Sequence, residues 1–316
     1  MPIVAVMRLF LAGGTGAIGR PLVRRLAAAG HEVTIFTRDA ERVSALGVPG
    51  VTAAVGDVLD ADTLVRAVAE AQPEVVINQL TNLPQTSSPA ALKRGLRATS
   101  RLRTEASATL VRAAEAAGAR RVIAQSISFI YRPGPGVRSE SDPLWTDAKG
   151  MIGLVAKPVA ALESATLSGN GPDGVVLRYG AFYGPGTYYD HDGAFATMVK
   201  RRLLPVPSGQ QGQFGFVHLD DAVGATMAAL SGPAGVFNVV DDVAAPAGEW
   251  ITLLASVLGA KKPFKAPSAV MRAAGAYSAY LMCQQPAVSN QKAKTELGWA
   301  PQYPDWHEGL PAALAR

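Results

Sequence analysis

A glycine-rich turn near the N-terminus constrains the fold of this 316-residue chain more than any other feature. The segment AGGTGAIG follows the apolar run RLFLA at 8–12 and precedes a helix-like stretch from 18 to 29. Its glycines permit a tight turn, let main-chain N–H groups approach a pyrophosphate, and let the helix pack on the strand. The helix N-terminus adds a dipole that favours an anion. The turn therefore predicts a dinucleotide site formed by Gly13, Thr15, Gly16, Ala17, Ile18 and Gly19.

Apolar runs and helix-like stretches alternate along the first half of the chain, which is typical of βαβ units and a parallel sheet. Strands are expected at 8–12, 32–38, 51–57, 74–80, 121–128, 174–180 and 235–240, and helices at 18–29, 62–71 and 89–117. We predict an α/β fold with a Rossmann-type doubly wound parallel sheet and a smaller C-terminal substrate lobe. The expected division is 1–180 and 181–316, approximate because chain segments can interleave.

Composition excludes several other classes of protein. With 48% hydrophobic and 17% charged residues, the chain is neither disordered nor fibrous. Cys283 is the only cysteine, which excludes a disulfide framework or a cysteine-based zinc site within one chain, and no metal site is predicted. The net charge of +5 is dispersed, which favours a polyanionic small molecule over nucleic acid.

The start of the chain resembles a strand rather than a signal peptide, and no uninterrupted apolar run reaches membrane-spanning length. Residues 1–6 precede a second methionine, Met7, and are expected to add little to the fold. We expect a cytoplasmic protein without membrane or nucleic-acid partners.

The end of the second expected strand bears on the choice of cofactor. It reads Thr37-Arg38-Asp39; an acidic residue here suits the 2′-hydroxyl of NAD, whereas an arginine suits the 2′-phosphate of NADP. Arg38 therefore favours NADP(H) over NAD(H), the alternative being that Arg38 is simply solvated and Asp39 contacts the ribose. Asp57 is placed to meet an adenine amine or to serve as a turn residue. The further cofactor-binding residues predicted are Thr37, Arg38, Asp57, Val58, Leu80, Thr81 and Tyr179.

Several motifs recur in a recognisable order: GGTGAIG, the Gly-Asp pair at 56–57, LRYGAFYGPG at 177–186, FVHLDDAVGA at 216–225, GVFNVVD at 235–241 and LGWAPQY at 297–303. Over nearly its whole length the chain resembles a short-chain dehydrogenase/reductase of the extended or atypical type, in the NAD(P)-dependent epimerase/dehydratase superfamily. The resemblance implies an NAD(P)-binding domain, a substrate lobe, and chemistry built on a Ser or Thr, a Tyr and a Lys in Y-x-x-x-K.

The chain departs from that pattern at the proton donor. No tyrosine lies four residues before a lysine, and the best-aligned lysine, Lys157, has Gly153 in the tyrosine position. The family's tyrosine is the general acid that protonates the new alkoxide as hydride arrives. Lys157 is implied to hold the nicotinamide ribose, the alternative being a surface lysine on a helix.

Candidate replacements for the donor lie on the strand at 121–128 and on the loop after the strand at 174–180. Ser126 and Ser128 share one strand face, and Ser126 is the preferred hydroxyl, although the family position could align with Ile127. Tyr183 is a candidate acid or a pocket wall, as are the neighbouring Tyr188, Tyr189 and His191. The predicted catalytic residues are Ser126, Ser128, Lys157 and Tyr183.

Other polar residues have simpler interpretations. In VHLDD, Asp220 or Asp221 is expected to cap the following helix, and His218 to be architectural. Lys93, Arg97 and Arg101 form a helical stripe that is expected to be a solvated face, with an anionic substrate or a dimer contact as the lesser alternative. The stretch at 268–282 is core or a lid and hints at a hydrophobic substrate.

Three functions remain in competition. The leading one is an NADP(H)-dependent oxidoreductase that acts on a small carbonyl or hydroxyl compound. The second is a nucleotide-sugar epimerase or dehydratase that regenerates its cofactor within one turnover. The third is a cofactor-binding sensor or scaffold without turnover. A small-molecule partner is expected in the first two, and a homodimer is possible.

Overall fold

The computed structural model describes residues 6–83, 88–168, 171–273 and 275–315. Its centre is a sheet of seven parallel strands in the order β11-β6-β5-β4-β1-β2-β3. The strands are β1 (Arg8–Ala12), β2 (Glu32–Thr37), β3 (Val51–Val55), β4 (Val75–Asn78), β5 (Arg121–Ile127), β6 (Asp173–Tyr179) and β11 (Gly235–Val239). The strand order reverses between β1 and β4, as in a doubly wound Rossmann sheet. The predicted fold class is confirmed.

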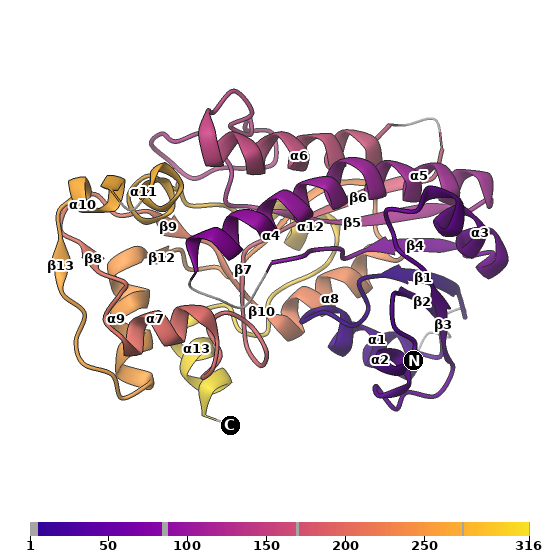
Figure 1. Ribbon diagram of the computed structural model, residues 1–316, viewed down its shortest axis with the longest axis horizontal. Helices are drawn as coiled ribbons and strands as arrows, with labels where there is room; N and C mark the ends of the chain where they lie inside the picture. Colours follow the sequence, from indigo (N-terminus) through magenta and orange to yellow (C-terminus); the bar gives the residue numbers. More distant parts are fainter. Residues whose placement is uncertain (1–5, 84–87, 169–170, 274, 316) are drawn as a thin grey trace.

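Helices cover both faces of the sheet (Figure 1). One face carries α1 (Gly19–Ala28), α2 (Glu41–Ser44) and α8 (Leu219–Ala229), and the other carries α3 (Ala61–Ala71), α5 (Ser107–Ala116) and α6 (Gly150–Thr166). Strand β1 shows how the sheet joins the two layers, because Leu9 and Leu11 pack into one apolar cluster while Phe10 and Ala12 pack into the other. Successive strand residues point to opposite faces, so a continuous apolar run is what a sheet covered on both sides requires.

The predicted helix over 89–117 is observed as α4 (Pro89–Arg101), the π-helix η1 (Leu102–Ala106) and α5 in unbroken succession. In η1 the amide of Ser107 donates to the carbonyl of Leu102, five residues earlier. The apolar pattern did not reveal this π turn, since one extra residue changes the phase of the helix without changing its composition.

The remaining elements form a smaller lobe around Phe216 and Trp250. Three two-stranded sheets pair β7 (Ala181–Tyr183) with β10 (Phe216–His218), β8 (Val206–Pro207) with β13 (Lys265–Ala266), and β9 (Gln213–Phe214) with β12 (Ala245–Pro246). Its helices are α7 (Ala194–Lys200), α9 (Ala247–Val257), α10 (Ser268–Ala273), α11 (Ala276–Cys283) and α13 (Trp306–Leu314). Helix α12 (Gln291–Glu296) packs on β11 instead.

Two elements that follow residue 180 lie in the Rossmann part of the molecule. Strand β11 pairs with β6 at the edge of the main sheet, and α8 packs against α1. The chain therefore leaves the sheet after β6, begins the lobe, and returns to the sheet before it completes the lobe. The exact division of the chain at residue 180 stays a prediction.

The cap of α8 differs from the expectation. The imidazole Nδ1 of His218, and not a carboxylate of Asp220 or Asp221, accepts from the amide of Asp220 at 3.2 Å. Asp221 instead accepts from the amides of Gln302 and Tyr303 at 2.7 and 3.0 Å, which fastens the C-terminal segment to α8. The motif is architectural, as predicted, but through a different set of bonds. Across the described ranges no helix has the length and apolar character to cross a membrane.

Candidate functional site

The glycine-rich turn lies between the carboxyl end of β1 and the start of α1, at the switch point of the sheet. Gly13 has φ of +95°, and a Cβ there would lie 2.5 Å from the carbonyl oxygen of Gln79. A Cβ on Gly19 would collide with the carbonyl oxygen of Gly13. Both positions therefore require glycine, and the turn is held as tight as a pyrophosphate cradle needs.

The start of α1 is open for an anion. Gly16 and Ala17 are exposed, while Ile18 is buried beneath them. No side chain caps the helix and no acidic residue lies in its first turn. The unpaired amides and the helix dipole therefore favour a phosphate group at this position. The turn fits the pyrophosphate of a dinucleotide, and the contacts predicted for Thr15, Ala17 and Ile18, which are part of this turn, stay a prediction.

The end of β2 separates the two candidate ribose-binding residues. One oxygen of the Asp39 carboxylate accepts from the amide of Glu41, the first residue of the short helix α2, at 3.0 Å. Arg38 is exposed, and within the described residues it makes no hydrogen bond or ion pair. Thr37 is buried and its hydroxyl is engaged with the Asp39 backbone. Of the two exposed charged groups, the guanidinium is the one without a bond among the described residues.

The other predicted cofactor residues divide into two groups. Asp57 and Val58 follow β3, where the Asp57 carboxylate accepts from the amide of Leu59 at 3.0 Å. Leu80 and exposed Thr81 follow β4, so both pairs lie along the carboxyl edge of the sheet. Tyr179 ends β6 at the same edge, but its side chain is fully buried and its hydroxyl bonds to the Thr226 hydroxyl at 2.6 Å. Its predicted contact with cofactor is not supported.

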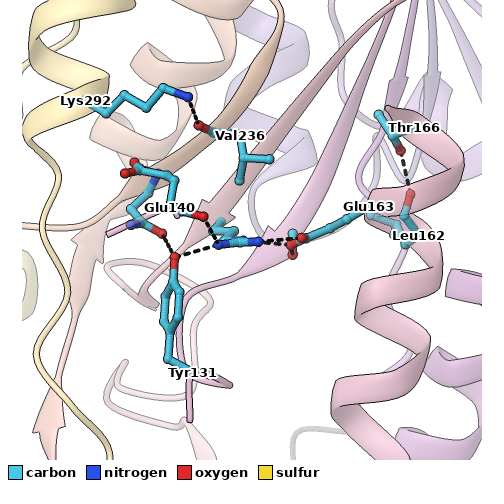
Figure 2. A network of polar contacts seen from close by, with 10 residues as sticks. Tyr131, Glu140, Leu162, Glu163, Thr166, Val236 and Lys292 are labelled. Atoms are coloured by element: carbon cyan, nitrogen blue, oxygen red, sulfur yellow. Dashed lines mark hydrogen bonds and ion pairs between the residues drawn. The ribbon is translucent and has the colours of Figure 1, made fainter. Parts of the chain in front are cut away.

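Ser126 belongs to a buried polar network between β5, β6 and α6. Figure 2 shows the part of this network that contains Tyr131 and Glu163. Its hydroxyl donates to Glu163 at 2.6 Å, and both Glu163 oxygens accept from Arg178, at 2.9 and 2.7 Å. Arg178 also donates to the Tyr131 hydroxyl at 2.7 Å, which donates to Asn238. Burial raises the pKa of Tyr131 to about 12. The hydroxyl of Ser126 is fully buried and bonded within this network, so the structure gives the preferred catalytic hydroxyl a structural role.

Lys157 does not face the sheet. It lies on the exposed side of α6, where it lines an open hollow of about 620 Å³ with Lys149, Gly153 and Pro158. The side of α6 that packs inward carries Val155, Ala156 and Val159. A Cβ on Gly153 would collide with the carbonyl oxygen of Ala148, so a tyrosine does not fit there. The surface interpretation of Lys157 therefore agrees better with the structure than the ribose-binding one.

The two remaining catalytic candidates differ in their surroundings. Tyr183 is fully buried in the lobe with its ring edge-on to Phe216 and His218, and its hydroxyl lies near Asp241 without a well-formed hydrogen bond. Burial, together with the Asp241 carboxylate, raises the pKa of Tyr183 far above its ordinary value, which opposes a role as an acid. Ser128 follows β5 directly, and its buried hydroxyl has no hydrogen-bond partner among the described residues. Ser128 is the predicted hydroxyl that stays a candidate.

Two hydrogen bonds show which residues of the helices lie next to the carboxyl ends of β4 and β5. Asn78, at the end of β4, donates to Ser107 at 2.8 Å, and Ser126, near the end of β5, donates to Glu163. A helical turn rises about 5.4 Å. The residues one turn earlier on each helix, Arg103 and Val159, therefore lie just beyond the carboxyl edge, where open α/β sheets bind their ligands.

We call the region just beyond the carboxyl edge, between Arg103 and Val159, the mouth of the sheet. Its described side chains are apolar apart from one buried cation, Arg103. Val155, Ala156 and Val159 of α6 pack with Leu96, Ile127 and Ile130. Arg103, on η1, is 5% exposed, and burial lowers its pKa to about 10. Sequence reasoning missed Arg103, because the regular spacing of Lys93, Arg97 and Arg101 drew attention to the outer face of the helix, where Arg101 pairs with Glu105.

Comparison with known proteins agrees with this geometry. Residues 13–183 match a protein-family model described as NAD(P)H-binding. The chain is 43% identical over 311 residues to a 3-diazoavenalumate denitrifying reductase from Streptomyces sp., an alignment that covers 96% of this chain and 99% of the relative. It is 28% identical over 280 residues to the human epimerase family protein SDR39U1, with 84% and 86% of the two chains covered.

Solved structures share the fold over nearly the whole chain. The Bordetella bronchiseptica enzyme WbmG, in complex with NAD and UDP, superimposes with a TM-score of 0.75 at 22% identity, covering 99% of this chain and 95% of WbmG. The dTDP-glucose 4,6-dehydratase DesIV from Streptomyces venezuelae gives 0.76 at 20% identity, covering 97% and 95%. Because the family model spans more than half of the chain and the sequence relatives are a reductase and an epimerase family protein, the chain is an NAD(P)-dependent oxidoreductase of the epimerase-type short-chain dehydrogenase/reductase family.

Proposed function

We propose that the protein is an NADPH-dependent reductase that removes a diazo group from an aromatic compound. The relative at 43% identity is named as a denitrifying reductase of a diazo compound, and it aligns over almost all of both chains. The proposal carries that reaction class to this chain and leaves the identity of the aromatic body open.

The residues at the turn and at the end of β2 support the preference for NADPH. Gly13, Gly16 and Gly19 would hold the pyrophosphate, and the exposed guanidinium of Arg38, which has no bond among the described residues, would meet the 2′-phosphate. When bound, NADPH supplies a hydride at the mouth of the sheet.

One observation carries the choice of reaction: α6 has Gly153 in the position of the family's proton donor, and its inward face carries only Val155, Ala156 and Val159 at the mouth. Reduction of a carbonyl forms an alkoxide that must be protonated. Reduction of an aryldiazonium ion does not, because hydride adds to the cation, the C–N bond breaks, and the products are the arene and N₂. An apolar wall is compatible with the second reaction and unfavourable for the first.

The test is a stoichiometric assay with 4-carboxybenzenediazonium as the probe. We expect one benzoate and one N₂ for each NADPH oxidised, above the rate without enzyme, and deuterium from [4-²H]NADPH on the ring carbon. The matched probe 4-carboxybenzaldehyde should be reduced far more slowly. The proposal fails if the aldehyde is reduced and the diazonium ion is not. A cofactor that is regenerated, or bound without consumption, would instead favour the epimerase/dehydratase or the sensor.

A further inference from the structure

Arg103 is a buried cation for which the described part of the chain provides no bonded partner. Arg103 is 5% exposed, and its guanidinium makes no hydrogen bond or ion pair with any described residue. Other buried arginines are bonded; Arg178 has Glu163 and Tyr131, and Arg121 has the carbonyl of Ala229 at 2.7 Å. Burying an unpaired charge is unfavourable, and proteins normally offset it with a counter-ion. Arg103 therefore lacks an anion.

The surrounding elements do not provide that anion. Glu163 on α6 is the carboxylate near enough to attract Arg103, but both of its oxygens already accept from Arg178 and one also accepts from Ser126. On α11, Tyr277 lies near Arg103, and burial raises its pKa to about 12 although the guanidinium opposes this, so its hydroxyl is neutral. Glu163 is therefore bonded to Arg178, and no bonded carboxylate is left for Arg103 among the described residues.

The local helix geometry concerns this same residue. Arg103 is the second residue of the π-helix η1, one turn beyond the bond that ties Ser107 to the end of β4. A π turn is rare inside an α-helix and is frequently found at functional sites. Here it lies at the carboxyl edge, where the inward side of the helix carries Arg103 while Thr104 and Glu105 are exposed.

We propose that Arg103 binds the carboxylate of an organic acid, the substrate reduced at this mouth. An apolar body would lie on half-buried side chains that pack against the cluster of Val155 and Val159, among them Leu83, Phe129 and Tyr277. A planar guanidinium binds a carboxylate through two parallel hydrogen bonds. The inference rests on the proposed function only in treating the acid as a substrate, since binding is measured separately from turnover.

The experiment titrates trans-cinnamate and its neutral analogue cinnamamide into the whole chain by isothermal calorimetry. Titrations are run without cofactor and with saturating NADP⁺, so that no turnover occurs. The variants are R103M, which keeps the apolar stem and removes the charge, R103K, which keeps a point charge, and R112M. Arg112 is an exposed arginine on α5 and receives the same change as a control.

We expect the unmodified protein to bind cinnamate about 10- to 100-fold more tightly than cinnamamide, the range that a charge-assisted pair supplies. R103M should lose this preference, R103K should keep part of it, R112M should keep all of it, and NADP⁺ affinity should be the same in every variant. Near-ultraviolet circular dichroism checks that R103M is folded, and if it is not, R103K and the unmodified protein decide the outcome.

Three results would overturn the inference: equal affinity for acid and amide in the unmodified protein, an undiminished preference in R103M or R103K, or loss of NADP⁺ binding in R103M. Absence of NADP⁺ binding to the unmodified protein is a separate result. It would contradict the proposed function, while the titrations without cofactor would still decide the role of Arg103.

Discussion

The buried Glu163–Arg178 ion pair is expected to stabilise the fold, and its contribution is expected to come from burial. Substitution E163Q keeps the size and some hydrogen bonding but removes the negative charge that faces Arg178 at 2.7 Å, where the side chains are 7% and 6% exposed. Breaking such a buried pair costs about 3–5 kcal/mol, because the remaining cation is left uncompensated. At about 2.1 cal/mol/K per residue, unfolding 316 residues has an entropy of roughly 0.66 kcal/mol/K. The melting temperature should therefore fall by about 5–8 °C.

The assay is differential scanning calorimetry beside a matched control. E105Q makes the same change in the exposed Arg101–Glu105 pair, whose N–O distance of 2.8 Å is nearly the same. It should leave the melting temperature unchanged within error, since solvent screens exposed pairs. A double change to apolar residues, E163L with R178M, should recover much of the loss. If E163Q and E105Q shift the melting temperature equally, burial is not what gives the network its strength.

Three further outcomes are expected. G19A should abolish measurable NADPH binding in calorimetry while the protein stays folded, because its Cβ would displace the Gly13 carbonyl; retained affinity would show that the turn can open at little cost. R38A should weaken NADPH binding about 10- to 100-fold and leave NADH binding unchanged, since one charge-assisted contact is lost, with the exposed R24A of α1 as control; equal loss for both cofactors would contradict a 2′-phosphate contact. Burial raises the pKa of Asp241 well above its ordinary 3.8, so the wild type loses stability as pH rises through that raised pKa. D241N should therefore melt higher than wild type at pH 8, with the difference vanishing below pH 3.8; a difference that is constant with pH would refute this reasoning.

The sheet could be predicted from the sequence because its strands are short apolar runs that are separated by turns and helices. In β1, Leu9 and Phe10 face opposite layers and both are buried, a pattern that few other folds produce. The glycine-rich turn could also be predicted, because a side chain at Gly13 or Gly19 would collide with the backbone and only glycine avoids this. Local sterics and periodicity therefore predicted the cofactor end of the molecule.

The catalytic residues could not be predicted in the same way, because their roles depend on where side chains from distant segments of the chain meet. Ser126 looked free on its strand but is bound to Glu163, which is 37 residues away. Lys157 has the expected residue type but lies on the outer side of its helix, and Arg103 faces inward on a π turn that leaves no periodic signal. The cytoplasmic location and the homodimer stay predictions.

The return of the chain to the main sheet has a consequence for how this protein can be divided. A fragment that stops after β7 would leave the β6 edge unpaired, because β11 is what covers it. Bare parallel edges recruit other strands, so such a fragment should aggregate rather than act as a free-standing nucleotide binder. For the same reason the smaller lobe cannot be exchanged between relatives as one contiguous segment: a chimera that keeps the sheet intact needs at least two crossover points, one on either side of β11.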